Sequence, residues 1–210
     1  MELNKLKNEV AYFMRRLYAQ RLTTTLGGNI SLKISPDNIL ITPSGIDKGT
    51  ITGEQIGELR IDGTNLTPAL KPSMETPMHL AIYAARPDVK TVLHAHPVTA
   101  STFAASNRKI NCRLIAESRL FLGEVFTAPY ACMGTADLAE SAVNALSAGN
   151  NAILMANHGA LTVGESLLQA FDRMEVLESA AKITLMASLL GNENELNEMQ
   201  LKQIDCLLTS

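Results

Sequence analysis

The stretch that decides the fold is VKTVLHAHP, residues 89–97, where an apolar run carries two histidines one residue apart and stops at a proline. A short apolar run bounded in this way is typical of a buried β-strand. Side chains two positions apart lie on the same face of a strand, so His94 and His96 are expected side by side. Two neutral imidazoles suit a transition metal. Because paired histidines also arise by chance, a metal site is indicated only if other ligands converge on this pair.

Segments with strand and helix patterns alternate on both sides of this stretch. We expect strands around 29–34, 39–42, 58–61, 89–96, 124–130 and 152–158, and helices around 2–21, 73–85, 98–106, 135–147 and 166–190. Such alternation indicates an α/β fold, with a single domain over residues 1–210 and a mixed central β-sheet flanked by helices. The polar residues from about 192 to 210 are expected to form a loosely held terminal helix.

The bulk composition narrows the function classes. The chain has 210 residues, of which 46% are hydrophobic and 19% charged, and a formal net charge of −3. This balance is that of a globular domain, and it provides no basic surface for nucleic acid or an anionic membrane. The N-terminus lacks the apolar core of a secretory signal, and no run reaches the length of a membrane span. Three widely spaced cysteines without a C-x-x-C pair fit a reducing compartment, so we expect a cytoplasmic protein.

A third histidine ends another apolar run. His158 lies in ILMANHGAL, where a predicted strand gives way to Asn-His-Gly, a common way to present a side chain into a cleft. We expect His94, His96 and His158 to meet at the ends of two neighbouring strands. Three protein ligands with a fourth position open is the arrangement of a catalytic zinc site. The alternative is that these histidines are hydrogen-bonded within the strand and the turn, without a metal.

A carboxylate and the fourth histidine share one predicted helix. Glu75, in KPSMETPMH, stands near the start of that helix, where the helix dipole favours a negative charge. His79 follows four residues later on the same helical face. Taken alone, Glu75 fits a solvated first-turn acid. We expect His79, beside Leu80 and Tyr83, to be a structural residue or a subunit contact.

Two glycine-containing turns, GGNIS and TPSG, offer hydrogen-bond donors to an anion. The candidate donors are Gly28 and Asn29 in the first turn, Thr42, Ser44 and Gly45 in the second, and Ser73 near the start of the helix that carries Glu75. Backbone N–H groups, hydroxyls and a helix N-terminus can together surround a phosphate without a P-loop. Each turn by itself fits a plain chain reversal better than an anion site.

Taken in order, these motifs resemble the class II aldolase and adducin family. The matching stretches are GGNIS (27–31), TPSG (42–45), PSMETPMHLAIY (72–83), HAHP (94–97), APY (128–130) and NHG (157–159). The resemblance implies a mixed sheet flanked by helices, one bound Zn²⁺ per subunit and a homotetramer with its sites between subunits. It is strongest to those zinc-dependent aldolases that cleave a ketose 1-phosphate, such as L-fuculose 1-phosphate, to dihydroxyacetone phosphate and a small aldehyde. A phosphorylated sugar is therefore the expected substrate.

The same resemblance implies a role for each matching position. His94, His96 and His158 match the zinc ligands. Glu75 matches an acid that binds zinc at rest and then acts as the general base. The phosphate-binding positions of the family are matched by Gly28, Asn29, Thr42, Gly45 and Ser73.

Three features depart from the family pattern. Met74 stands where a second serine is usual, which removes a phosphate donor. The C-terminal tail and the segment 97–129 lack the tyrosines that serve the aldolases as acids. Glu117 is the candidate replacement, contributed by a neighbouring subunit, and a surface ion pair with Arg113 or Arg119 is its alternative role.

Other functions on the same scaffold stay open. A sugar-phosphate 4-epimerase typically carries aspartate at the position of Glu75, and a sugar-acid phosphate decarboxylase tends to carry lysine at that of Met74. A dehydratase is a further alternative, and so is a metal-free adducin-like interaction domain, although adducins generally lack the metal ligands. A Schiff-base aldolase would need a lysine in apolar surroundings, and no lysine lies in an apolar strand of this sequence.

Overall fold

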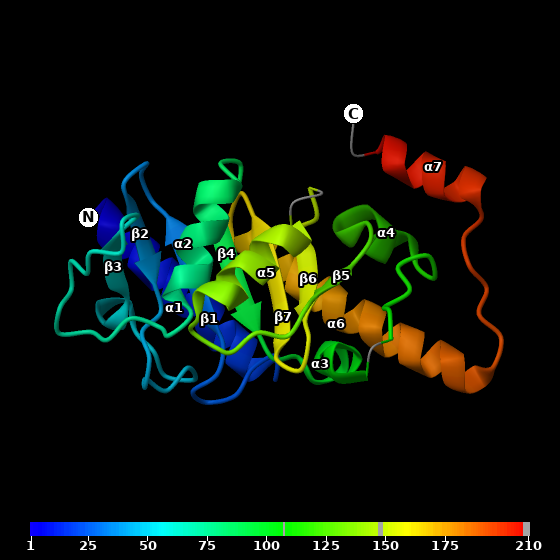
Figure 1. Ribbon diagram of the computed structural model, residues 1–210, viewed down its shortest axis with the longest axis horizontal. Coiled ribbons are helices and arrows are strands. Elements are labelled where there is room, and N and C mark those ends of the chain that lie inside the picture. Colours follow the sequence, from blue (N-terminus) through cyan, green and yellow to red (C-terminus); the bar gives the residue numbers. More distant parts are fainter. Residues whose placement is uncertain (107, 147–148, 208–210) are drawn as a thin grey trace.

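Seven strands form one mixed sheet in the order β3-β2-β1-β4-β7-β6-β5 (Figure 1). The computed structural model describes residues 1–106, 108–146 and 149–207, so the last three residues of the predicted polar tail lie outside the described part. The strands are β1 Asn29–Lys33, β2 Asn38–Ile41, β3 Gly57–Arg60, β4 Thr91–Ala95, β5 Phe126–Ala128, β6 Ala152–Met155 and β7 Gly159–Gly164. Neighbouring strands are antiparallel except for the parallel pair β5 and β6. The mixed sheet predicted from the sequence is confirmed.

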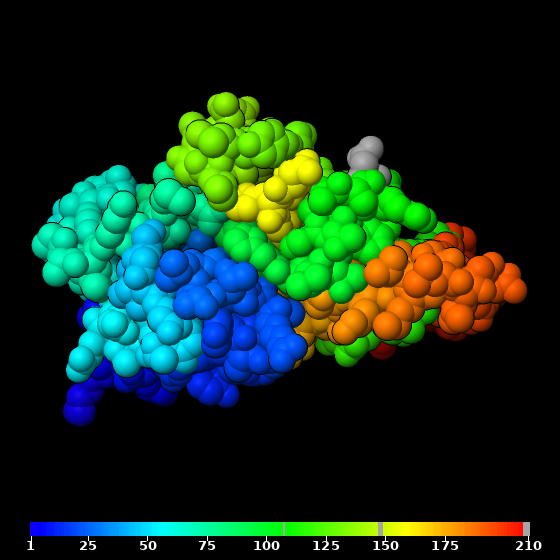
Figure 2. All heavy atoms as spheres, turned by 90° about the horizontal axis from the view of Figure 1, so that it is seen from below, coloured from blue at the N-terminus to red at the C-terminus, as the bar shows by residue number. Residues whose placement is uncertain are grey.

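Helices cover both faces of this sheet (Figure 1). They are α1 Glu2–Ala19, α2 Thr76–Ala85, α3 Val98–Ser106, α4 Ala116–Leu122, α5 Ala136–Leu146, α6 Leu167–Leu190 and α7 Glu198–Cys206, with a short 3₁₀ helix at Gly53–Gln55. One apolar core joins the sheet to α1, α3 and α6, and a second joins its other face to α2 and α5. The second half of α6 extends past the sheet, at the end opposite β3 (Figures 1 and 2). Among the described residues, no helix is long and apolar enough to span a membrane.

Strand alternation places several polar side chains under α2. In β1, Ile30 belongs to the core beneath α1, α3 and α6, so Asn29 and Ser31 face the other way. In β4, Leu93 belongs to that same core, so His94 shares the opposite face. The antiparallel register of β1 and β4 sets Asn29 directly across from His94. Asn29, Ser31 and His94 are therefore buried together on the α2 side of the sheet, next to the start of that helix.

Most helix ends follow the signals in the sequence. The Thr135 hydroxyl accepts a hydrogen bond from the Leu138 N–H at 3.3 Å, as expected of a residue that caps α5. Gly191, with φ of +81°, ends α6 in the left-handed conformation. The start of α3 is fixed from outside, because the Glu178 carboxylate of α6 accepts hydrogen bonds from its first backbone N–H groups.

Two elements were missing from the sequence-based assignment. The helix α4 follows a stretch without clear periodicity, and β7 directly follows the Asn-His-Gly turn. Because β7 pairs with both β4 and β6, the strands that carry or precede the three histidines are not neighbours. The expectation of two neighbouring strand ends was therefore wrong. A tight β6–β7 turn, rather than an adjacent strand end, brings His158 to β4.

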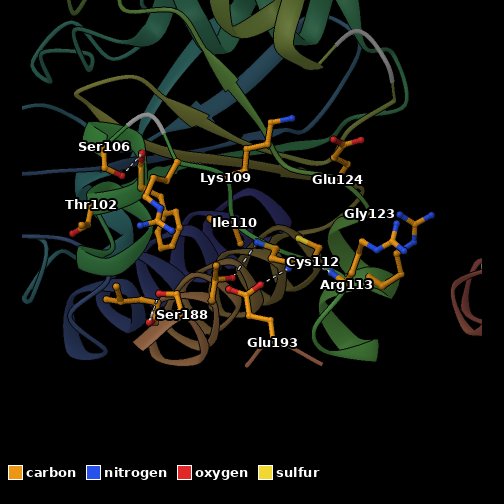
Figure 3. A pocket seen from close by; sticks show the side chains of 16 residues that line it. Thr102, Ser106, Lys109, Ile110, Cys112, Arg113, Gly123, Glu124, Ser188 and Glu193 are labelled. Carbon is orange, nitrogen blue, oxygen red and sulfur yellow. Dashed lines mark hydrogen bonds between the residues drawn. The ribbon is translucent and has the colours of Figure 1, made fainter. Parts of the chain in front are cut away.

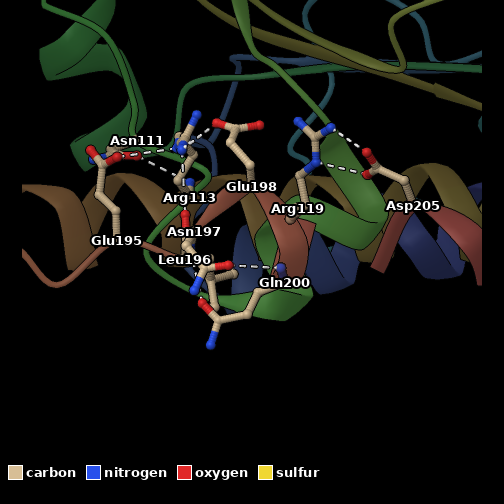
Figure 4. Close-up of polar contacts among 9 residues, drawn as sticks. All are labelled: Asn111, Arg113, Arg119, Glu195, Leu196, Asn197, Glu198, Gln200 and Asp205. Atoms are coloured by element: carbon tan, nitrogen blue, oxygen red, sulfur yellow. Dashed lines mark hydrogen bonds and ion pairs between the residues drawn. The ribbon is translucent and has the colours of Figure 1, made fainter. Parts of the chain in front are cut away.

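The predicted terminal helix is α7, which packs beside α4 and is held to it by ion pairs (Figure 4). Arg119 of α4 forms two hydrogen bonds to the Asp205 carboxylate, at 2.8 and 2.7 Å. Arg113, just before α4, contacts Glu198 at 2.8 Å. Exposed pairs of this kind each contribute at most about 1 kcal/mol, so the attachment depends on several acting together.

A candidate metal centre and active site

Three histidine rings converge at the C-terminal end of β4, the central strand of the sheet. The ring centroids of His94 lie 4.7 Å from those of His96 and of His158, and the latter two lie 5.6 Å apart. One nitrogen from each ring lies within 4.8 Å of the other two. Zinc–nitrogen bonds of about 2.0–2.1 Å in a tetrahedron place ligand atoms roughly 3.3 Å apart, so small side-chain adjustments would close this group around an ion.

Backbone constraints bring the rings together. His94 lies in β4, and the His96 N–H just beyond that strand donates to the Leu22 carbonyl at 3.0 Å. His158 lies in the turn before β7, after Asn157 in the left-handed conformation. A Cβ atom added to Gly159 would lie 2.6 Å from the His96 ring. Only glycine fits there, because any side chain would push the β6–β7 turn away from His96.

The protonation state of the rings suits a metal. His94 Nδ1–H donates to the Ala160 carbonyl at 2.9 Å, which leaves the Nε2 lone pair directed at the other histidines. Its Nε2 lies 3.0 Å from His96 Nε2. Burial lowers the pKa of His94 to about 3 and also lowers the pKa of His96, so both rings are neutral at pH 7. His158 Nδ1 is buried without a hydrogen-bond partner among the described residues, and its Nε2 lies beside the Glu75 carboxylate. Three convergent imidazoles fit a divalent transition metal.

Glu75 adds a carboxylate to the histidine group from the start of α2. Its carboxylate is 7% exposed, with Oε1 2.9 Å from His158 Nε2 and Oε2 3.4 Å from His94 Nε2. Oε2 also accepts a hydrogen bond from Asn29 Nδ2 at 2.6 Å. Burial alone would raise the pKa of Glu75, but the hydrogen bonds from His158 and Asn29 and the nearby His94 hold it well below its usual range. Glu75 is therefore an ionised carboxylate that faces the metal-binding position.

A directed chain of hydrogen bonds orients the amide that holds Glu75. His79 Nε2–H donates to Asn29 Oδ1 at 2.6 Å, which turns the Asn29 NH₂ group toward Glu75. His79 Nδ1 accepts from the Ser31 hydroxyl at 2.7 Å, and Ser31 accepts from the Tyr83 hydroxyl at 2.7 Å. Burial lowers the pKa of His79 to about 4, so the ring is neutral and can accept and donate at once.

His79 is thus a structural residue within one chain, with no exposed surface for a subunit contact. Its connection to Glu75 through Asn29 was not recognised from the sequence. The available signals were spacings: His79 follows Glu75 by four residues in a helix, and Ser31 follows Asn29 by two in a strand.

Three of the six candidate phosphate donors belong to this group. The Ser73 hydroxyl oxygen accepts from Asn29 Nδ2 at 3.0 Å and from the Glu75 N–H at 3.3 Å, so its own proton is free to donate. Gly28, with φ of +68°, leaves no room for a Cβ, which would lie 2.8 Å from the His94 carbonyl oxygen. The first turn is therefore packed directly against the histidine strand.

The other three lie in the 42–45 turn and face different surroundings. Thr42 is buried, and its hydroxyl accepts from the Ile30 N–H at 3.1 Å. The Ser44 hydroxyl donates to the Pro72 carbonyl at 3.0 Å, next to Ser73 in sequence. Gly45 has φ of +73° and open space around its Cα. Both hydroxyls thus contact the protein itself.

Lys48 follows this turn and was not identified from the sequence. Its side chain is 1% exposed, although it lies in a loop rather than a strand. Nζ donates to the Pro43 carbonyl at 2.7 Å, and no carboxylate among the described residues forms an ion pair with it. Burial lowers its pKa to about 8. A buried lysine therefore does exist in this chain, in a loop rather than in the apolar strand that the sequence-based argument considered.

Removing the Lys48 charge is expected to stabilise the fold. Lys48→Met should raise the free energy of unfolding at pH 7 by about 1 kcal/mol, because the lost desolvation penalty exceeds the lost hydrogen bond. Lys48 has a pKa of about 8 in the folded protein and about 10.5 in the unfolded chain, so the stability of the wild type rises as the pH rises between these values. The stability difference between Lys48→Met and the wild type therefore becomes smaller at high pH. Urea unfolding at pH 7 and pH 10 measures this. A variant that is less stable at both would contradict the expectation.

Two further residues lie apart from the histidine group. Glu117 is exposed on α4, and its alternative partners are engaged elsewhere, Arg113 with Glu198 and Arg119 with Asp205. Met74 is 61% exposed. Its Cβ lies 3.7 Å from the position a Cβ would take on Gly134, so the loop after β5 approaches the Ser73–Glu75 segment at this point.

A hollow of about 640 Å³ lies elsewhere, between α3, α6 and the segment that leads into α4 (Figure 3). Its lining includes Lys109, Cys112 and Arg113, together with Thr184 of α6. None of the three histidines and no part of Glu75 lines it. The candidate site is a cluster at the C-terminal end of β4, and the hollow is a separate feature.

Comparison with known proteins agrees with this arrangement. The family model for the class II aldolase and adducin N-terminal domain matches residues 8–185. The chain belongs to the class II aldolase and adducin family. It is 31% identical over 184 residues to an L-fuculose phosphate aldolase of Methanocaldococcus jannaschii, covering 88% of this chain and 98% of that protein. It is also 31% identical over 173 residues to a 3-oxo-tetronate 4-phosphate decarboxylase of Haemophilus influenzae, covering 80% of this chain and 81% of the relative.

The fold agrees as well. A solved structure of an L-fuculose 1-phosphate aldolase superposes with a TM-score of 0.88 and 31% identity, covering 98% of this chain and 97% of the other. The family and the fold expected from the sequence motifs are both confirmed. Within the class II aldolase family, aldolases and decarboxylases are both similar to this chain.

Proposed function

We propose that this chain is a zinc-dependent aldolase that cleaves a ketose 1-phosphate to dihydroxyacetone phosphate and a small aldehyde. The observation that carries the proposal is an ionised, buried carboxylate, Glu75, within 3.4 Å of two of three convergent imidazoles. L-Fuculose 1-phosphate or a related deoxy-ketose 1-phosphate is the proposed substrate. His94, His96 and His158 would hold one divalent cation. When bound, that cation would draw electrons from the substrate carbonyl as the carbon–carbon bond breaks.

The side chains of the protein would transfer protons and orient the substrate. Glu75 would take the proton from the C4 hydroxyl, so that the C3–C4 electron pair moves toward the carbonyl and the aldehyde departs. Asn29 would keep Glu75 in place through its 2.6 Å hydrogen bond. Ser73, Gly28 and the 42–45 turn would orient the phosphate and thereby set which bond meets the carboxylate. Glu117 of a neighbouring subunit in a homotetramer is our proposal for the acid that returns a proton to C3.

The chemistry of the decarboxylase explains why it is the main competitor. Loss of CO₂ from 3-oxo-tetronate 4-phosphate leaves the same three-carbon enediolate as aldol cleavage of a ketose 1-phosphate, and both therefore yield dihydroxyacetone phosphate. The reactions differ in the group that leaves. An aldehyde departs only as a hydroxyl loses its proton, whereas a carboxylate needs no base. The Glu75 carboxylate, held ready as a base, favours the aldolase.

Two products must be measured to separate these reactions. Zinc-loaded protein is incubated with L-fuculose 1-phosphate, 5-deoxyribulose 1-phosphate and 3-oxo-tetronate 4-phosphate, and dihydroxyacetone phosphate is followed by coupled reduction. Aldehyde and CO₂ are measured in parallel. We expect aldehyde and triose phosphate in equal amounts from a ketose 1-phosphate. Triose phosphate with CO₂ from the sugar acid alone would assign the decarboxylase instead.

Loss of the Ser73 hydroxyl is expected to weaken substrate binding. Ser73→Ala removes a donor directed at a charged phosphate, which typically contributes about 1–3 kcal/mol, or roughly 5-fold to 150-fold in kcat/KM. The change should fall mainly on KM, because zinc and Glu75 are retained. Initial rates across substrate concentrations measure both constants. Unchanged kinetics would remove Ser73 from the phosphate site.

A further inference from the structure

We propose that Lys48 is a specificity-determining and positioning residue for the anionic end of the substrate. Its buried positive charge lies directly behind the 42–45 turn and favours a phosphate over a neutral group there. This inference rests on the proposed function, because it concerns the phosphate of the substrate bound at that same site. Lys48 itself makes no contact with the substrate in this account, and it acts through the turns that it joins.

Lys48 connects the two donor turns by separate hydrogen bonds. Its ammonium donates to the Pro43 carbonyl at 2.7 Å, in the centre of the second turn. Its backbone N–H donates to the Thr25 carbonyl at 2.9 Å, just before Gly27 and Gly28 of the first turn. One residue therefore fixes the separation of the two loops between which an anion would bind.

Both turns also contact the residues around the proposed catalytic site. In the first, a Cβ on Gly27 would lie 2.9 Å from His96 Nδ1, so the loop lies against the histidine cluster. In the second, the Ser44 N–H donates to the Lys71 carbonyl at 3.0 Å, and Pro43 pairs with Pro72 across an isolated bridge. The segment 71–72 leads directly into Ser73. A displacement of Lys48 would therefore change the positions of both phosphate-binding turns relative to the histidines.

The charge of Lys48 has no counter-ion among the residues that the structure describes. Burying an unpaired ammonium is unfavourable, and a neutral side chain of the same length would fill the space without that penalty. With a pKa lowered only to about 8, Lys48 keeps its proton at neutral pH. Because the Thr42 side chain is buried and the Ser44 hydroxyl already donates to the protein, a positive charge behind the turn would strengthen the attraction of this loop for an anion.

A covalent role for Lys48 does not fit the geometry. A Schiff base requires the amine to attack a carbonyl carbon of the substrate. The Lys48 side chain is 1% exposed and its ammonium is bound to a backbone carbonyl. Its role is therefore electrostatic and positional.

Two metal-binding probes that differ only in a phosphate test this role without turnover. Phosphoglycolohydroxamate and glycolohydroxamate are titrated calorimetrically into zinc-loaded protein. For the wild type we expect the phosphorylated probe to bind at least about 100-fold more tightly. Lys48→Met should reduce that ratio by at least about tenfold and leave the affinity of the unphosphorylated probe within about twofold. Lys48→Gln, which keeps a donor for the Pro43 carbonyl but has no charge, should behave like Lys48→Met.

Lys182→Met, which removes an exposed charge on α6, is the matched control and should change neither affinity. A parallel loss for both probes in the Lys48 variants would mean a purely structural role and would overturn the inference. So would a wild-type ratio in Lys48→Gln, or equal binding of the two probes by the wild type. A Lys48-dependent phosphate preference without any aldol cleavage would uphold the inference and reject the proposed reaction.

Discussion

His96→Ala is expected to abolish metal binding and catalysis together. Removing one of three imidazoles leaves His94, His158 and a Glu75 carboxylate that Asn29 holds in place, so we expect the zinc affinity to fall sharply. We expect less than about 0.1 equivalent of zinc after gel filtration and a fall in kcat/KM of at least about 10³-fold. His96 is the preferred position because it lies just beyond β4 and is only partly buried, whereas His94 is fully buried inside the strand. Metal analysis by mass spectrometry and the coupled triose phosphate assay measure the two effects.

Metal-depleted wild-type protein serves as the matched control for this variant. Treatment with a chelator should reproduce the inactivity of His96→Ala, and added zinc should restore the wild type alone. Circular dichroism checks that the variant keeps its secondary structure. Full zinc content together with normal turnover in His96→Ala would show that this ring is not a ligand.

Glu75→Gln is expected to separate catalysis from metal binding. Glutamine has the same shape and keeps a carbonyl oxygen to accept from Asn29, so the histidines and the zinc content should be largely preserved. The amide cannot take a proton, and loss of a positioned general base typically costs about 10²–10⁴-fold in rate. We expect this loss in kcat for aldol cleavage, with KM changed little. Steady-state kinetics and metal analysis on the same preparation measure both.

The same variant also distinguishes the two competing lyase reactions. Decarboxylation of a sugar acid requires no proton removal from a hydroxyl, so it should be much less sensitive to Glu75→Gln than aldol cleavage is. Near-normal aldol turnover in Glu75→Gln would show that another group is the base. Loss of zinc in this variant would instead assign Glu75 a mainly structural part in metal binding.

The sequence allowed the fold class and the shared face of His94 and His96 to be predicted because both depend on local patterns. An apolar run with histidines two residues apart specifies a strand and a shared face, and His94 and His96 lie together as expected. The Asn-His-Gly motif specifies a turn with room for a close approach, which Gly159 provides. Helix α3 begins directly after Pro97, at the residue that the proline signal indicated.

What could not be predicted depends on contacts between distant segments. Strand β7 was missed, and with it the pairing that brings His158 to β4, because pairing order is set by the whole sheet. The link from His79 to Asn29 spans 50 residues and appears only once α2 lies over β1. Lys48 lies in a polar loop, and only the packing of the surrounding turns buries it.

X-ray absorption spectroscopy of the zinc-loaded protein tests the central claim most directly. If three imidazoles surround one cation, the zinc edge should show nitrogen and oxygen neighbours at about 2.0–2.1 Å, with the outer-shell scattering of three histidine rings. His96→Ala should not retain enough zinc to give this spectrum. Sulfur neighbours at about 2.3 Å in the wild type, or a wild type that binds no zinc at all, would contradict the account.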